Sequence, residues 1–284
     1  MIHTNEAGLP EVLAAALTPD RRATKPGTFS VTELIAPPQI RILTRKHQHE
    51  LTEDVASRLR RFNDGLLHHV LERLGGTGGR KVERLLSYAT DDGVVAGSFD
   101  VLLVGTELVE YRSVSTWRVS KGVPQDWVER LNLYAEILRR RGRAVTALTV
   151  VGMFKDWTAS RAREEGYPRA EVQTFDIPLW EPEEASAFLR ARLALHQAAD
   201  GGTYPPCSPE ERWEKPTKYA LMKAGRQRAV KVYDDEETAR GNMTSGQHYI
   251  EPRPGQSTRC LFYCRVAAFC PQRAAILSAT DGEE

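Results

Sequence analysis

The sequence predicts an α/β protein, with a mixed central sheet flanked by helices and a C-terminal lobe that carries the cysteines. Apolar residues recur at helical spacing in some segments and form short strand-like runs in others, in the order helix, strand, strand, helix, strand. The length of 284 residues exceeds one average domain of about 150 residues. All four cysteines follow residue 206, which sets the C-terminal part apart from the rest.

The composition excludes several classes of protein. With 41% hydrophobic and 27% charged residues, the chain has enough apolar surface to fold, so wholesale disorder is excluded. The longest mostly apolar run, residues 144–154, is shorter than the ~18–20 residues of a membrane-spanning helix. Residues 12–17 are apolar, but Glu6 and Glu11 lie where a secretory signal has basic residues. We therefore expect a cytoplasmic protein without a membrane partner.

The first elements of the core follow an N-terminal arm expected over residues 1–28, where the apolar pattern is weak. A capping box at Ser30–Glu33 begins a short helix, which Pro37-Pro38 ends. Apolar residues at helical spacing predict a long amphipathic helix over 51–74. These elements open a core that we expect to span residues 29–200.

The rest of the core is predicted to alternate strands and helices. Strands over 94–104 and 108–114 are expected to pair as a hairpin across the turn at 105–107. The remaining elements are helices over 126–141 and 182–199 and strands over 144–154 and 175–179.

The C-terminal lobe is expected over residues 201–276, followed by a flexible tail at 277–284. A hairpin over 219–233, turning at Gly225, is inserted between the first cysteine and the other three. The cysteine spacing is C-x52-C-x3-C-x5-C, formed by Cys207, Cys260, Cys264 and Cys270. Because cytosolic chains seldom keep disulfides, four clustered thiols favour a metal or iron–sulfur site over buried cysteines that act as small apolar residues.

Two acidic residues lie on the neighbouring strands of the predicted hairpin. Asp100 and Glu110 could share a hard divalent cation such as Mg²⁺, although acids that flank a hairpin are also commonly solvated. His69 could add an imidazole ligand from the preceding helix, or be an ordinary helix histidine. On the later helix, Arg130 and Tyr134 are one turn apart and share a face that could contact phosphate.

A local excess of positive charge runs from Arg112 to Arg143, with eight basic residues against three acidic ones. Such a stretch is either a solvated helix face or a surface for phosphate groups. Trp117 and Trp127 within it could stack on unpaired bases, but packing into the fold is the simpler account.

In this order, the residues resemble the RecB-type branch of the PD-(D/E)XK nucleases. The pattern that carries the resemblance is Gly65 four residues before His69, Gly97-x-x-Asp100, Glu110-x-Arg112, Arg130-x-x-x-Tyr134 and the cysteines. The resemblance implies a restriction-endonuclease-like core, with His69, Asp100, Glu110 and the Tyr111 carbonyl binding Mg²⁺ or Mn²⁺. The cysteine spacing is similar to that of RecB-like exonucleases with a 4Fe-4S cluster, which implies such a cluster, with Zn²⁺ as the alternative.

The chain departs from the family pattern at three positions. Arg112 stands in place of the family's catalytic lysine and Arg130 in place of its helix glutamine. An arginine stabilises transition-state charge but is too basic to exchange a proton with water. The first cysteine, Cys207, follows the core, whereas the family usually places it before the core.

The resemblance therefore implies a divalent-metal-dependent DNA nuclease, either an exonuclease or an enzyme that processes DNA ends. Asp100, Glu110 and Arg112 would be its catalytic residues, and Arg130 and Tyr134 its DNA-binding residues. Two alternatives stay open. One is a nuclease-derived module that binds DNA without cleaving it, and the other is a zinc-stabilised structural protein.

Overall fold

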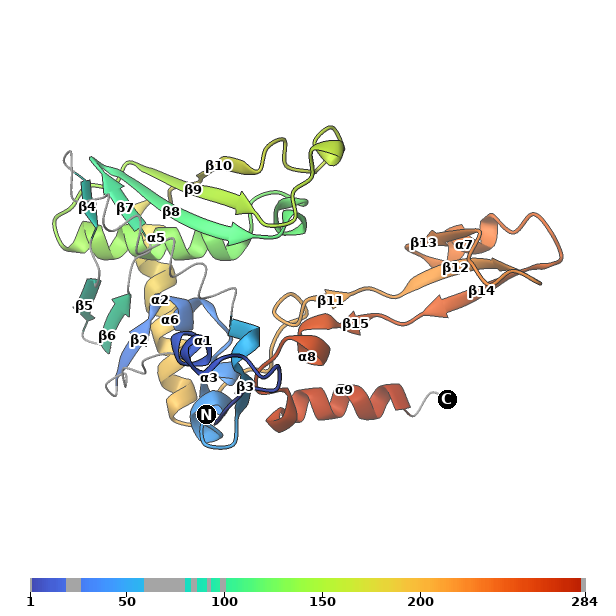
Figure 1. Cartoon of the computed structure of the whole chain (residues 1–284), viewed down its shortest axis with the longest axis horizontal. Coiled ribbons are helices and arrows are strands. Elements are labelled where there is room, and N and C mark those ends of the chain that lie inside the picture. Colours follow the sequence, from blue (N-terminus) through green and yellow to red (C-terminus); the bar gives the residue numbers. More distant parts are fainter. Residues whose placement is uncertain are drawn as a thin grey trace. The chain divides into compact units, whose positions relative to one another are not determined.

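The computed structural model of the chain describes residues 2–18, 27–58, 80–82, 86–90, 93–97 and 101–281. It divides into two compact units (Figure 1). Unit 1 comprises Met1–Pro38 and His49–Tyr204, and unit 2 comprises Gln39–Gln48 and Pro205–Glu284. Both units contain helices and strands, so the predicted α/β class is confirmed.

The largest sheet of unit 1 is mixed and has five strands. Their order is β10 (Val172–Ile177), β9 (Ala147–Phe154), β8 (Glu107–Val114), β7 (Val101–Val104) and β4 (Arg80–Val82). The central strand β8 pairs in parallel with β9 and antiparallel with β7. Gly105, at a φ of 64° that favours glycine, lies in the turn between β7 and β8, so the predicted hairpin is confirmed.

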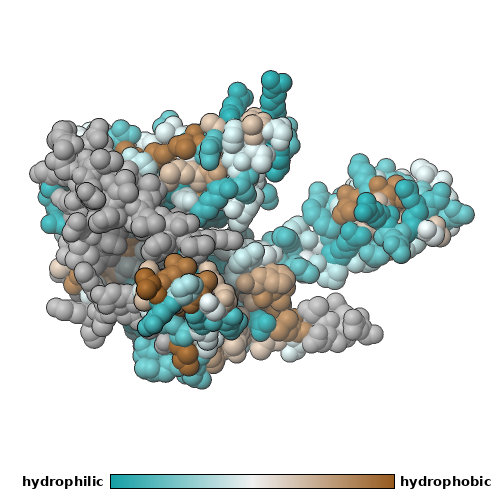
Figure 2. Space-filling model, viewed as in Figure 1, coloured by the Kyte–Doolittle hydropathy of each residue, from teal (hydrophilic) through white to brown (hydrophobic). Residues whose placement is uncertain are grey.

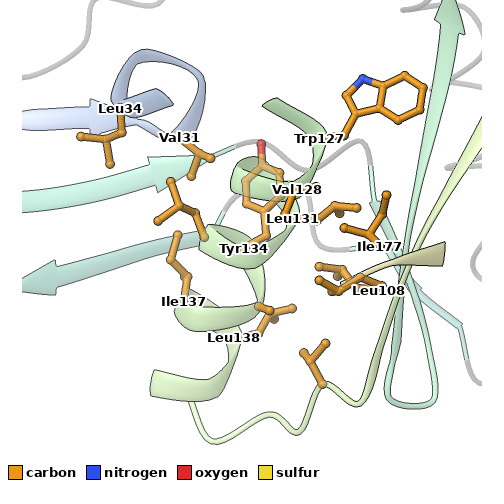
Figure 3. Close-up of a cluster of buried hydrophobic side chains, with 14 of the residues drawn as sticks. Val31, Leu34, Leu108, Trp127, Val128, Leu131, Tyr134, Ile137, Leu138 and Ile177 are labelled. Atoms are coloured by element: carbon orange, nitrogen blue, oxygen red, sulfur yellow. The ribbon is translucent and has the colours of Figure 1, made fainter. Parts of the chain in front are cut away.

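Helix α5 (Gln125–Arg140) packs against β8, β9 and β10 and supplies much of the core. Trp127, Leu131, Tyr134 and Leu138 recur at intervals of three or four residues, and all four are buried as their spacing predicts. They pack with Leu108 of β8, Ile177 of β10 and residues of α2 (Val31–Ile35), as Figure 3 shows. Helix α6 (Pro182–Asp200) packs against α2 and α5 and begins with a proline at its first turn.

Helix α2 is held at both ends. At its start the predicted capping box is present, because the Ser30 side chain accepts from the Glu33 backbone N–H and the Glu33 carboxylate accepts from the Ser30 N–H. At its end, Arg192 of α6 donates to the carbonyls of Leu34 and Ala36. A three-stranded sheet of β2 (Thr28–Ser30), β6 (Gly93–Gly97) and β5 (Leu86–Thr90) leads into this helix.

The predicted helix over 51–74 is corrected within the described ranges. β1 (Ile2–Thr4) pairs in parallel with β3 (Thr52–Asp54), so residues expected in an arm and in a helix form one small sheet. Helix α1 (Glu11–Leu17) follows β1 and buries Leu17, and η1 (Val55–Arg58) follows β3. Residues 59–74 of the predicted helix lie outside the described residues. The predicted strand over 94–104 is likewise two strands, β6 and β7, of different sheets.

Unit 2 contains a ribbon and a three-stranded sheet. The predicted hairpin of β12 (Lys218–Lys223) and β13 (Lys231–Tyr233) is present, and β14 (His248–Arg253) pairs on the other side of β12. Helix α7 (Glu236–Gly241) packs on this sheet. The strands continue into β11 (Glu214–Lys215) and β15 (Gln256–Ser257), where a Cβ on Gly255 would lie 2.3 Å from the Lys215 carbonyl oxygen, so only glycine fits.

Three of the four cysteines of unit 2 lie on or beside short helices, and Cys207 lies in an irregular segment before the turn at 209–213. α8 (Thr258–Phe262), η4 (Ala267–Phe269) and α9 (Pro271–Asp281) follow the ribbon, and α3 (Pro38–Lys46) belongs to this unit except for its first residue. Helix α9 continues to Asp281, into the range 277–284 that was expected as a tail. The short helices η2 (Thr116–Val119) and η3 (Ala159–Arg161) lie in unit 1. Among the described residues, no helix is both long enough and apolar enough to cross a membrane.

Candidate functional site

Glu110 lies in the central strand of the five-stranded sheet and is only 1% exposed. Side chains alternate along a strand, so Glu110 shares a face with Leu108, which packs in the core below α5. On the neighbouring strand β9, Glu110 lies beside Val150, which is also in the core. A carboxylate buried in such apolar surroundings needs a charged or polar partner to stay ionised.

Arg112 supplies a partner from the same strand. Its Nη2 donates to Oε1 of Glu110, and its side chain is partly exposed. Residues i and i+2 of a strand lie on one face, so the sequence itself determines this pairing. Tyr111, between them in the chain, is half-buried and its side chain points to the opposite face.

Two of the predicted metal ligands, His69 and Asp100, lie outside the described residues. Val101, which follows Asp100 in the chain, pairs directly with Glu110 across the β7–β8 ladder. The first residue of β7 therefore lies opposite the buried carboxylate. The convergence of His69, Asp100 and Glu110 on one ion stays a prediction.

Arg130 and Tyr134 have different environments although they are one turn apart on α5. Arg130 is partly exposed, and its Nη1 donates to Thr32 Oγ1 of α2 at 3.5 Å. Tyr134 is 4% exposed, and its ring packs among core side chains, close to Val31 of α2 (Figure 3). Arg130 is thus the more accessible of the two predicted DNA contacts.

The basic stretch from Arg112 to Arg143 is partly neutralised by ion pairs. Arg118 pairs with Asp126, and both Arg139 and Arg140 pair with Glu136. With Arg112 bound to Glu110, at least four of the eight basic residues therefore have an acidic partner. Trp127 is buried, in agreement with the packing interpretation, whereas Trp117 is exposed.

A buried network at the end of α5 was not identified in the sequence. Burial alone would raise the pKa of Glu136, but hydrogen bonds from Ser186 and Arg140 and the charges of Arg140 and Arg139 hold that pKa below its ordinary value. The Arg140 guanidinium also lies 5.2 Å from the centre of the Tyr88 ring. Because Ser186 is 50 positions from Glu136 and Tyr88 precedes it by 48, no local pattern could indicate this network.

The four cysteines of unit 2 are free thiols. Burial raises the pKa of Cys207 to about 12, and the negative charge of Glu211 adds to this effect. Burial also raises the pKa of Cys260, with Cys264 and Cys270 adding to it. Arg259 offsets part of both rises and Arg212 part of the rise at Cys260, but burial outweighs these cations, so both pKa values stay above that of a free cysteine.

Two glutamines position Cys207, and the sequence analysis missed both. Gln272 accepts from the Cys207 N–H and donates to its carbonyl, each at 2.9 Å. Gln39 of α3, which is almost fully buried, accepts from the same N–H at 3.2 Å and donates to Cys270 Sγ at 3.3 Å. Gln39 therefore links the first cysteine to the last.

The donor chemistry of this region suits a thiolate-bound metal group, since the charges of Cys260 and Cys270 raise the pKa of Cys207, those of Cys264 and Cys270 raise the pKa of Cys260, and two arginines lie nearby. Within the described ranges, however, no three His, Cys, Asp or Glu side chains are grouped closely enough to hold a metal ion. The four-thiolate site therefore stays a prediction.

Comparison with known proteins assigns no family. No protein-family model matches the chain, and no curated protein matches it. The chain is similar to a solved structure described as "Crystal structure of SSO0001", with 14% identity and a TM-score of 0.44. The similarity covers 66% of this chain and 83% of that one.

Proposed function

We propose that the protein is a divalent-metal-dependent DNA nuclease of RecB type, with a restriction-endonuclease-like core, that degrades or processes DNA ends. The observation that carries this proposal is the buried Glu110 carboxylate on the central strand, opposite Val101 and beside Arg112. A buried acid at the middle of a sheet is costly for folding, so its presence there indicates a functional role.

The proposed mechanism assigns a role to each residue. Glu110 and Asp100 would hold Mg²⁺ or Mn²⁺ through carboxylate oxygens, with His69 and the Tyr111 carbonyl as further ligands. Such an ion activates water and neutralises charge on a phosphodiester. Arg112 stays protonated and stabilises the negative charge that develops on the phosphate, while Arg130 and Tyr134 would contact the DNA strand.

The cysteine region is proposed to hold a 4Fe-4S cluster, with Zn²⁺ as the alternative occupant. Cys207, Cys260, Cys264 and Cys270 would be its ligands, and the cluster would stabilise unit 2. The effects of neighbouring cysteines on the pKa values of Cys207 and Cys260, and the nearby cations Arg259 and Arg212, support this assignment.

A second candidate is a DNA-binding module that has lost catalysis. The contact between Arg112 Nη2 and Glu110 Oε1 favours it, because a guanidinium there neutralises the carboxylate without a metal ion. In an active enzyme, Arg112 must therefore release Oε1 of Glu110 when the metal ion binds.

Incubation of the purified protein with end-labelled single- and double-stranded DNA tests the proposal. We expect cleavage in Mg²⁺ or Mn²⁺ that stops with chelator, and no cleavage by Glu110→Gln, which keeps the shape of the side chain but removes its charge. Asp156→Asn is the matched control and should leave cleavage unchanged. Asp156 is an acid of unit 1 that is distant from Glu110 in the chain and accepts a hydrogen bond from the Thr116 N–H. DNA binding without any cleavage in either metal would favour the second candidate.

A further inference from the structure

Three exposed aromatic rings and one arginine form a contiguous cluster in unit 2, here called the aromatic platform. Phe262, Tyr263 and Trp213 are 68%, 66% and 40% exposed. The ring centres of Trp213 and Tyr263 are 5.5 Å apart, and those of Tyr263 and Phe262 are 6.4 Å apart. The Arg259 guanidinium lies 5.3 Å from the centre of the Trp213 ring. Figure 2 shows apolar surface where α8, which contributes to the platform, is exposed.

The backbone holds Trp213 in this arrangement. Its φ is 52°, a left-handed conformation that residues with a side chain disfavour. The turn is fixed by a hydrogen bond from the Trp213 N–H to the Glu210 carbonyl and by two bonds from Arg259, to the carbonyls of Arg212 and Glu211. Arg259 thus secures the turn with its backbone and one guanidinium nitrogen, and its guanidinium lies over the ring.

Basic side chains slightly outnumber acidic ones around the platform. Residues 210–215 and 258–265 contain four basic side chains, Arg212, Lys215, Arg259 and Arg265, against three acidic ones, Glu210, Glu211 and Glu214. Arg212 pairs with Glu214, so Lys215, Arg259 and Arg265 are the candidate cations for phosphate. The exposed large hydrophobic side chains of these two segments are all aromatic. A surface of rings and cations without exposed aliphatic side chains suits nucleobases and phosphates better than the mixed apolar surface of a protein partner.

We propose that the aromatic platform binds unpaired bases of single-stranded DNA. Each exposed ring offers a face for one base, and the basic side chains would contact the phosphates. The ring planes are tilted by 53° and 73° to one another, so neighbouring rings fit bases that have separated and not a continuous base stack. The choice of DNA rests on the proposed function, whereas the stacking mode rests on the platform alone.

Binding of a fluorescent oligothymidine of about 15 nucleotides, measured by anisotropy without divalent metal, tests this proposal. Tyr263→Leu and Phe262→Leu keep an apolar side chain but remove the π-face, so each should raise the Kd for the oligonucleotide by about 10-fold. Tyr263→Phe should bind as the wild type does. The matched control is Tyr249→Leu, an exposed tyrosine of β14 in the same unit, which should leave the Kd unchanged.

Cys260 and Cys264 lie close to the substituted rings in the chain, so each leucine variant is also checked for its fold. Its thiol content and its thermal unfolding temperature should match those of the wild type. A wild type that does not bind the oligonucleotide overturns the proposal, as does wild-type affinity of the leucine variants. The proposal is also overturned if the leucine variants lose as much affinity for duplex DNA as for the single-stranded oligonucleotide. The nuclease proposal can fail separately. If the wild type binds the oligonucleotide but cleaves no DNA, and the leucine variants lose that binding, the result supports the platform and refutes the enzyme.

Discussion

Arg112 contacts a carboxylate that is almost fully buried, so a change at this residue alters the charge of the candidate site directly. If the site is active, Arg112→Ala should lower the rate of DNA cleavage by roughly 100-fold, as expected for the loss of one contact that stabilises transition-state charge. Arg112→Lys should retain or increase the rate. Single-turnover cleavage of end-labelled DNA measures both.

The same pair of variants identifies the alternative. If catalysis has been lost, the wild type should be silent in Mg²⁺ and in Mn²⁺, and Arg112→Ala should mainly weaken DNA binding. A silent wild type that still binds DNA would lead us to prefer the binding module over the enzyme.

The thiol of Cys207 should react slowly with alkylating reagents. Because burial raises the pKa of its thiol to about 12, only about one molecule in 10,000 carries the thiolate at pH 8 in metal-free protein. Alkylation of Cys207 by iodoacetamide should therefore be at least about 100-fold slower than that of a free cysteine and should rise about tenfold per pH unit. Mass spectrometry of the peptide that contains Cys207 measures the rate.

Glu211→Gln provides the check on cause. The Glu211 charge helps to raise the pKa of Cys207, so its removal should speed alkylation at a fixed pH. Labelling of wild-type Cys207 at the rate of a free cysteine at pH 8 would show that its thiol is not buried as described.

Helix α5 is held against α6 by the ion-pair network at Glu136. The pKa of Glu136 is held below its ordinary value, so the folded state binds this proton less readily than the unfolded state does. The network therefore contributes fully above the unfolded pKa of about 4.5, and the contribution is lost as the pH falls through the lower folded value.

Glu136→Gln should lower the free energy of unfolding at pH 7 by about 2 kcal/mol, between the values for exposed and fully buried pairs. Urea denaturation at pH 7 and pH 3.5 measures this, and the gap between variant and wild type should narrow at the lower pH. Arg161→Ala is the matched control, because its pair with Glu164 is exposed. A gap that stays constant with pH would contradict the assigned pKa direction.

Local patterns predicted the elements whose packing agrees with their own periodicity. α5 was predictable because Trp127, Leu131, Tyr134 and Leu138 mark one buried face, and the β7–β8 hairpin because a glycine turn separates two apolar runs. In residues 51–58 the local pattern and the observed structure disagree. Their apolar spacing is helical, but Thr52–Asp54 pairs with Ile2–Thr4 some 50 positions earlier, a partnership that no local window contains.

The candidate site divides in the same way. Glu110 and Arg112 could be placed together from the sequence, because positions i and i+2 of a strand share a face. Gln39 could not be connected with Cys207, which follows it by 168 positions. The sequence thus identified the charged pair and the thiols, while the amide that contacts two cysteines became visible only in three dimensions.

All four thiols belong to unit 2. Loss of a thiol ligand should therefore change the stability of unit 2 and leave that of unit 1 unchanged. If the thiols bind a metal group, Cys264→Ala should reduce the metal content and destabilise unit 2, because ligation contributes to folding free energy. Hydrogen exchange should then increase in residues 39–48 and 205–281 and stay unchanged in α5 and β8.

Absorbance near about 400 nm distinguishes a 4Fe-4S cluster from colourless zinc in the same preparation, since the cluster is brown. Unchanged metal content in Cys264→Ala would exclude Cys264 as a ligand. Equal destabilisation of both units would contradict the selective role of the thiols.

The assignment of residues 39–48 to unit 2 has a consequence for synthesis of the chain. Gln39 leaves the ribosome 168 residues before Cys207, which corresponds to about 8 to 34 s at about 5–20 residues per second. During that interval the side chain of Gln39 lacks its partners Cys207 and Cys270. Unit 2 is therefore completed only after translation has passed through all of unit 1, and its α3 segment must remain available for late docking.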